Sequence, residues 1–186
     1  MKLSVIIPTH NPEPARFRRT LEGLAQQTLP HQDWELLLVD NGSRTPLTSE
    51  EVIPHFPGTH RIVREETLGL SHARKTGIEE AHSDLLVFSD DDNVLARNYL
   101  ESALHRLEEN PTVGVAGGKS LPEYLEHPPE WYVEGMAPLG CRDLGKKDLL
   151  LTGEHYAEVK RYPGFAPIGA GLLFRREAVS SWMKTV

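Results

Sequence analysis

Three adjacent aspartates stand where a run of apolar residues ends. Asp90, Asp91 and Asp92 follow residues 85–88, an apolar run typical of a strand that is buried on both faces. Neighbouring carboxylates repel one another, so gathering them requires a compensating positive charge. Mg²⁺ or Mn²⁺ would supply it, because these ions favour oxygen ligands and keep some waters and substrate phosphates in their shell. The cluster therefore indicates a candidate metal site.

The same aspartates admit a second interpretation. Aspartate is favoured at helix N-termini, so an isolated triplet is equally typical of an exposed acidic turn that caps the next helix. A calcium loop is not indicated, because that loop needs ligands at alternate positions and a central glycine. The position at the end of a predicted buried strand favours a site over a simple turn.

Two further polar turns end apolar runs. Residues 3–7 lead into Thr9-His10-Asn11, and residues 34–39 lead into Asp40-Asn41-Gly42-Ser43. Apolar residues at helical spacing lie between and after the runs, over 17–25, 70–81 and 100–107. This alternation predicts an α/β fold with a mostly parallel central sheet flanked by helices. Ligands bind outside the C-terminal ends of parallel strands, so we expect the three polar turns at one edge of the sheet.

The remaining elements are shorter. Residues 44–60 are predicted to be a loop with one short helix, and 61–64 and 113–115 short strands. Gly169 to Gly171 form a predicted turn into a strand, with a helix beginning near Glu177. Residues 119–168 contain many prolines and aromatic residues without a period, which predicts an irregular segment within a single domain, 1–186. Within it, Trp131 is either a core residue or a stacking platform.

Composition excludes several classes of function. The formal net charge is −7, whereas nonspecific nucleic-acid binding needs a basic face. No apolar stretch approaches the roughly 20 residues of a spanning helix, so membrane contact is expected only through regions outside this chain. Cys141 is the single cysteine, and a reducing, cytoplasmic compartment is the simple expectation.

Five motifs in order resemble family 2 glycosyltransferases, whose fold is GT-A, a Rossmann-like α/β fold. Residues 4–11 (Ser-Val-Ile-Ile-Pro-Thr-His-Asn) resemble the opening strand, and 39–43 (Val-Asp-Asn-Gly-Ser) the second motif, where Asp-Asp-Gly-Ser is common. Residues 69–77 resemble the Ala-Arg-Asn-x-Gly helix start, with Lys75-Thr76 replacing Asn-x. Residues 88–92 resemble the Asp-x-Asp metal motif, and 169–176 the glycine-rich segment before the acceptor region. The resemblance covers essentially the whole chain and implies that the irregular segment 119–168 lies on the acceptor side.

The resemblance implies a role for each matched residue. Asp92 would ligate the metal, Asp40 would hydrogen-bond the base, often uracil, and Asp91 would hold the ribose or the sugar, with Asp90 assisting. Taken singly, Asp40 is also an ordinary turn former, and Thr9 and Asn11 could simply close a turn. The positions implied to bind a nucleotide sugar are Pro8, Thr9, Asn11, Asp40, Arg74, Lys75, Asp90 and Asp91.

The implied activity is transfer of a sugar, with inversion, from a nucleotide-diphosphate sugar to a hydroxyl acceptor, with a UDP-sugar as the favoured donor. Mn²⁺ or Mg²⁺ would stabilise the leaving diphosphate, and a general base would take the acceptor proton. In relatives that base follows the glycine-rich segment. Glu177 is too close to Arg175 and Arg176 to fit, so the base is expected beyond Val186, in a chain truncated at its C-terminus.

Two alternatives stay open. One is a nucleotide-sugar-binding module without catalysis. The other is a phosphotransfer domain of receiver type, in which Asp40 would accept the phosphoryl group; the aspartates at 90–92 and the glycines at 169–171 then lack a role.

Overall fold

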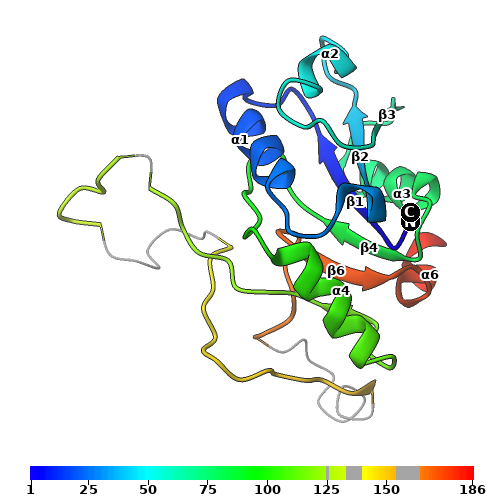
Figure 1. The fold of residues 1–186 in the computed structure, drawn as a ribbon, viewed down its shortest axis with the longest axis vertical. Coiled ribbons are helices and arrows are strands. Elements are labelled where there is room, and N and C mark those ends of the chain that lie inside the picture. Colours follow the sequence, from blue (N-terminus) through cyan, green and yellow to red (C-terminus); the bar gives the residue numbers. More distant parts are fainter. Residues whose placement is uncertain (125, 133–139, 154–163) are drawn as a thin grey trace.

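The computed structural model describes residues 1–124, 126–132, 140–153 and 164–186. These residues form a six-stranded sheet with helices on both faces (Figure 1). The strands are β1 (Leu3–Thr9), β2 (Trp34–Asn41), β3 (His60–Glu65), β4 (Leu85–Phe88), β5 (Val115–Ala116) and β6 (Leu172–Arg175). The α-helices are α1 (Pro14–Ala25), α2 (Ser49–Val52), α3 (Leu70–Glu80), α4 (Tyr99–Glu109) and α6 (Ser180–Met183), and the 3-10 helices are η1 (His31–Asp33) and η2 (Arg176–Val179).

The strand order is β3-β2-β1-β4-β6-β5. Strands β1 to β4 are parallel, whereas β6 is antiparallel to β4 and to β5. The predicted α/β fold with a mostly parallel sheet is therefore confirmed. Every residue of β1 and β2 is buried. Such strands read as nearly continuous apolar runs because both of their faces are covered, and that is how the sequence reveals them.

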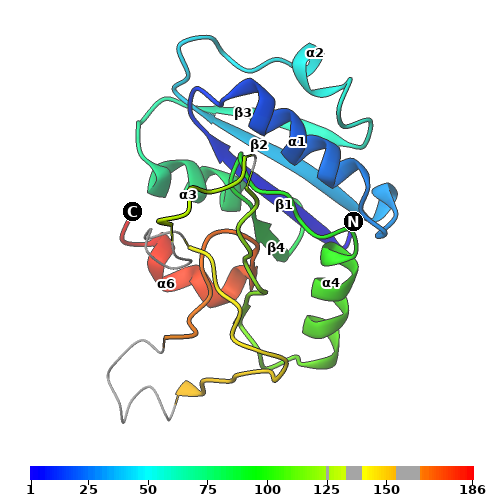
Figure 2. The same cartoon turned by 90° about the vertical axis from the view of Figure 1, so that its left-hand side faces the viewer.

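Successive side chains of each strand point to opposite faces, so the sheet separates two apolar cores. Val5 and Ile7 pack in the core that α1, α2 and α4 cover, while Ile6 packs in the core beneath α3 and α6. Figure 2 shows α1 and α4 on one side of the sheet and α3 and α6 on the other. The small residues predicted on α3 allow a close approach, because a Cβ at Gly77 would fall far inside van der Waals contact with Ile6.

Several element boundaries differ from the predictions, among them those of β2, β5 and the helix after β6. Strand β2 continues through Asp40 and Asn41, because the ladder with β3 extends that far. The strand expected at 113–115 is Val115–Ala116, since pairing with β6 and not local composition sets its limits. The helix expected near Glu177 begins as η2 and becomes α6 only at Ser180.

Two adjacent arginines at the end of β6 tie a helix to each face of the sheet. Arg175 donates to the carbonyls of Leu107, in α4, and Val113. Arg176 points the other way and donates to the carbonyls of Ile78, in α3, and of two further residues, Ala81 and Ser83. Carbonyls at a helix C-terminus lack intrahelical partners, and a cation there also interacts favourably with the helix dipole. The pair therefore holds the antiparallel strand in place.

Replacing Arg176 by methionine is expected to lower the free energy of unfolding by about 2 kcal/mol, because three carbonyls in partly buried hydrogen bonds lose a charged donor. Urea denaturation followed by circular dichroism would measure the change. Arg18→Met is the matched control, since the Arg18 side chain is 55% exposed in its pair with Glu22, one turn away. Equal stability of the two variants would contradict the capping role.

Residues 119–124, 126–132 and 140–152 contain no helix or strand, only an isolated bridge between Ser120 and Arg142. Part of the predicted irregular segment, residues 125, 133–139 and 154–163, lies outside the described residues. Trp131 is 72% exposed, so the core interpretation of this residue is wrong. No helix in the described part of the chain has the length and apolar character needed to cross a membrane.

Candidate functional site

The acidic turn follows β4 directly and is fastened to two other elements. The Thr9 hydroxyl, at the end of β1, donates to Asp91 Oδ2. The Thr20 hydroxyl, on α1, lies 3.1 Å from the Asp91 carbonyl oxygen, with the Arg16 carbonyl as its other acceptor. Both threonines are buried. The side chain and the main chain of Asp91 are thus oriented from different elements.

The other two aspartates have different surroundings. Asp90 Oδ1 lies 3.7 Å from Arg74 Nη2. Asp92 is exposed, and its Oδ1 accepts a hydrogen bond of 3.2 Å from its neighbour Asn93. Burial raises the pKa of Asp90, with the Asp92 and Asp91 charges adding to the effect and Arg74 opposing it. Burial also raises the pKa of Asp91, against the Thr9 hydrogen bond and together with the Asp92 charge.

The donor set of this turn fits a hard cation that arrives with other ligands. Raised carboxylate pKa values mean that the turn holds its negative charge at a cost, which a cation would relieve. Within the described ranges, no group of three or more His, Cys, Asp or Glu side chains is arranged to hold a metal. The three aspartates therefore do not form a closed cage. Mg²⁺ and Mn²⁺ are suited to such a turn, because one or two carboxylates, waters and substrate phosphates complete their shell.

Arg74, on α3, is packed closely against the acidic turn. Its guanidinium carbon lies 5.3 Å from the centroid of the Phe88 ring, and its side chain is 26% exposed. Its Nε is buried and finds no acceptor among the residues that the structure describes. Arg74 is thus not the solvated helix residue that its sequence context alone would also allow. Lys75, its neighbour, donates to the carbonyl oxygen of Val186.

Asp40 lies inside β2 and is 1% exposed. Its Oδ1 accepts from the Ser43 N–H at 3.1 Å. Its Oδ2 accepts from the Leu47 N–H at 3.0 Å and from Arg64 Nη1 at 2.7 Å. Burial alone would raise the pKa of Asp40, but the hydrogen bonds from Ser43, Leu47 and Arg64 outweigh it and hold the pKa below its ordinary value. Asp40 organises the loop after β2, and its contact with a base stays a prediction.

A second network joins the ends of β1 and β2. His10 Nδ1 lies 2.6 Å from the Asn41 carbonyl, which only accepts, so Nδ1 carries the proton and Nε2 accepts from Asn11 Nδ2 at 2.7 Å. Asn11 has a φ of 49°, in the left-handed region that asparagine tolerates. Its N–H donates to Ser43 Oγ, and its Oδ1 accepts from the Arg44 N–H. Pro8, by contrast, is buried within β1.

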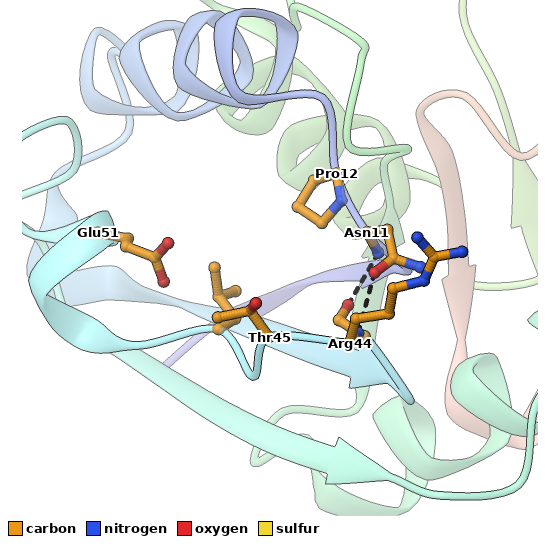
Figure 3. A pocket seen from close by; sticks show the side chains of 7 residues that line it. Asn11, Pro12, Arg44, Thr45 and Glu51 are labelled. Atoms are coloured by element: carbon orange, nitrogen blue, oxygen red, sulfur yellow. Dashed lines mark hydrogen bonds between the residues drawn. The ribbon is translucent and has the colours of Figure 1, made fainter.

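A cavity of about 310 Å³ lies beside this network, between the start of α1 and the loop after β2 (Figure 3). Asn11 is the one predicted nucleotide-binding residue on its wall; the aspartates at 90–92 and Arg74 do not line it. The cavity adjoins the ends of β1 and β2, whereas the acidic turn lies at the end of β4. Its lining residues are Asn11, Pro12, Ser43, Arg44, Thr45, Leu47 and Glu51.

The predicted glycine turn reaches the same edge of the sheet. The Gly171 N–H donates to the Phe88 carbonyl at 3.0 Å, and the Tyr99 hydroxyl donates to the Gly171 carbonyl. Burial raises the pKa of Tyr99, although a hydrogen bond from the backbone of Gly118 opposes the shift. Glu177, in η2, lies after the far end of β6, where Arg176 N–H donates to the Asp84 carbonyl. That is the opposite edge of the sheet from Asp90.

Sequence reasoning missed several residues that position the site. Asn41 and Ser43 belong to the motif at residues 39–43, so the sequence indicates their position but not their contacts. Thr20, Arg64 and Tyr99 lie outside every recognised motif, and no local pattern marks them. Among the predicted site residues, the structure brings Thr9 into contact with Asp91 and Arg74 into contact with Asp90.

Solved structures with the same fold include nucleotide-sugar complexes. The chain is 29% identical to a mannosyltransferase from Pyrobaculum calidifontis, solved with GDP-Man and Mn²⁺, at a TM-score of 0.55 over 66% of this chain and 36% of that one. Staphylococcus aureus TarS, solved with UDP-GlcNAc, is 24% identical at a TM-score of 0.58, over 70% of this chain and 37% of that one. The second likeness concerns the fold alone.

Curated relatives are glycosyltransferases. The chain is 28% identical over 182 residues to the glucosyl-dolichyl phosphate glucuronosyltransferase of Haloferax volcanii, which covers 95% of this chain and 53% of that protein. It is 29% identical over 133 residues to the poly(ribitol-phosphate) beta-N-acetylglucosaminyltransferase TarP of S. aureus, and the match covers 67% of this chain and 40% of that protein. The chain thus spans about half the length of the first relative and less of the second. The sequence profile named "Glycosyl transferase family 2" matches residues 4–182, and the chain therefore belongs to this family.

Proposed function

We propose that this chain binds the donor in a metal-dependent, inverting glycosyltransferase that transfers a sugar from a nucleotide-diphosphate sugar to a hydroxyl acceptor. Membership of glycosyl transferase family 2 supports the reaction class. The mannosyltransferase solved with GDP-Man and Mn²⁺ supports a nucleotide-sugar donor and a divalent cation. A UDP-sugar is the favoured donor, Mn²⁺ or Mg²⁺ the favoured cation, and Pro8, Thr9, Asn11 and Asp40 the predicted nucleotide side of the site.

The observation that carries the proposal is the unequal engagement of the three aspartates. Asp91 is held by Thr9 and Asp90 faces Arg74, whereas Asp92 is exposed and bonded only to the adjacent Asn93 among the described side chains. Asp92 is therefore the carboxylate that is free to ligate a cation. The bound cation would stabilise the charge that builds on the leaving diphosphate.

The surrounding residues would then orient the donor. Arg74 places a guanidinium beside the acidic turn, where it can face the phosphates. Asp91, fixed by Thr9 and Thr20, would present its remaining carboxylate oxygen to the ribose or sugar. Lys75 follows Arg74 on α3 and would lie near the nucleotide as well.

The two alternative functions agree less well with these findings. The hypothesis of a receiver-type phosphotransfer domain is wrong, because the chain belongs to a glycosyltransferase family. In addition, Asp40 is only 1% exposed, so it offers no free carboxylate to a phosphodonor. A non-catalytic nucleotide-sugar-binding module is less well supported, since relatives such as the glucuronosyltransferase and TarP are transferases. Glu177 is unsuited as the base, because it lies at the opposite edge of the sheet from Asp90.

Calorimetric titration with UDP, GDP and TDP, each with and without Mn²⁺, tests the proposal. We expect one nucleotide to bind, and only when the metal is present, because the acidic turn lacks a closed cage and needs the diphosphate to complete the metal shell. Mn²⁺ alone should bind weakly. Addition of EDTA should release the nucleotide. Binding of equal strength without metal would count against the proposed site.

A further inference from the structure

The two glycines of the turn before β6 are required for different reasons. Gly171 has a φ of 75°, and a Cβ there would lie 2.8 Å from the Tyr99 hydroxyl oxygen. Its backbone therefore demands glycine. Gly169 does not adopt a positive φ, so its backbone would accept alanine. A Cβ at Gly169 would instead fall far inside van der Waals contact with Arg74 Nη2.

The Arg74 guanidinium is confined by three groups. The Phe88 ring lies against it at 5.3 Å, the Asp90 carboxylate lies 3.7 Å from Nη2, and Gly169 leaves the room that the same nitrogen occupies. Phe88 and Asp90 belong to the end of β4 and the acidic turn. Gly169 belongs to the turn that returns the chain from the irregular segment, and the Gly171 hydrogen bond to the Phe88 carbonyl holds that turn in place.

We propose that Gly169 is a positioning residue, whose missing side chain lets the Arg74 guanidinium lie over the Phe88 ring and face Asp90. A side chain at 169 would push the guanidinium away from both groups while leaving the backbone unstrained. The consequence for catalysis rests on the proposed function, in which Arg74 and Asp90 serve the same donor. Misplacement of a catalytic group by about 1 Å can cost on the order of a hundredfold in rate.

The test is Gly169→Ala, made in the wild-type protein and in an Arg74→Ala background. In the wild-type background kcat should fall on the order of tenfold to a hundredfold. In the Arg74→Ala background the same substitution should change kcat less than about twofold, because no guanidinium remains to be displaced. Gly164→Ala is the matched control, since a Cβ at Gly164 meets nothing within 4 Å among the residues that the structure describes and should leave kcat unchanged.

A second measurement does not require transfer activity. The Nε–H resonance of Arg74 in a ¹⁵N NMR spectrum should carry a ring-current shift from Phe88, which Phe88→Leu identifies and Gly169→Ala should remove. If the wild-type protein neither binds a donor nor transfers sugar, the proposed function fails while this measurement still tests the position of Arg74. Wild-type kcat in Gly169→Ala, an equal loss in both backgrounds, or an unchanged Arg74 resonance would each overturn the inference.

Discussion

Replacing Asp92 by alanine should lower sugar transfer on the order of a thousandfold and remove metal-dependent nucleotide binding. The reason is that Asp92 is exposed and bonded only to Asn93 among the side chains described, which leaves it as the carboxylate that can hold the cation. A cation at a leaving diphosphate is worth several kcal/mol, and each factor of ten in rate corresponds to about 1.4 kcal/mol. Initial rates at saturating donor and calorimetric titration with Mn²⁺ would measure both losses.

The stability of the Asp92 variant separates a metal role from a structural one. Removing one of three adjacent negative charges relieves repulsion, so the thermal midpoint should stay the same or rise. Asp92→Asn keeps the side chain's shape but removes the charge, and it should lose nearly as much activity. Asp84→Ala is the control, because Asp84 precedes the other end of β4 and its side chain is 94% exposed. Unchanged metal-dependent binding in Asp92→Ala would contradict the assignment.

Replacing Asp40 by alanine should destabilise the fold by about 3 kcal/mol, because the Ser43 and Leu47 N–H groups and the Arg64 guanidinium lose a buried charged acceptor. Nucleotide binding should weaken with it, since the loop after β2 carries Ser43, which receives the Asn11 N–H. Chemical denaturation at neutral pH and nucleotide titration of the same preparations would measure the two effects.

The loss in Asp40→Ala should depend on pH with a definite sign. The pKa of Asp40 in the folded protein is below its ordinary value, so its ionised form stabilises the fold above the unfolded pKa of about 4. As the pH falls through the lowered pKa, the carboxylate protonates and the difference between wild type and variant should shrink. Asp148→Ala is the control, because the Asp148 side chain is 79% exposed in its pair with Arg106, so its removal should leave the free energy of unfolding close to that of wild type.

These measurements also decide how Asp40 serves the nucleotide. The structure predicts that stability and binding fall together, because Asp40 is 1% exposed and acts through the loop. A variant as stable as wild type that no longer binds nucleotide would show instead that Asp40 contacts the base directly, as the family resemblance implies.

Much of the fold could be predicted from local patterns. The apolar runs at residues 3–7, 34–39 and 85–88 indicated buried parallel strands, and those strands are β1, β2 and β4. The direction of β6 could not be predicted in this way. Strand β6 pairs antiparallel to β4 after a long irregular segment, and the caps that hold it, Arg175 and Arg176, bond to carbonyls 62 or more positions away.

The sequence by itself determined that the acidic turn lies at the end of a buried strand, that two other polar turns share that edge, and that the chain resembles a glycosyltransferase. The tertiary structure decided which aspartate of the acidic turn is free and why the Asp40 carboxylate is fully engaged. It also decided why a side chain at position 169 would displace Arg74. The physical reason is the separation along the chain between the residues that interact. Periodicity and turn chemistry depend on neighbouring residues, whereas Asp91 is held by Thr9 from 82 positions away and Asp40 by Arg64 from 24. Such partners are chosen only when the strands assemble.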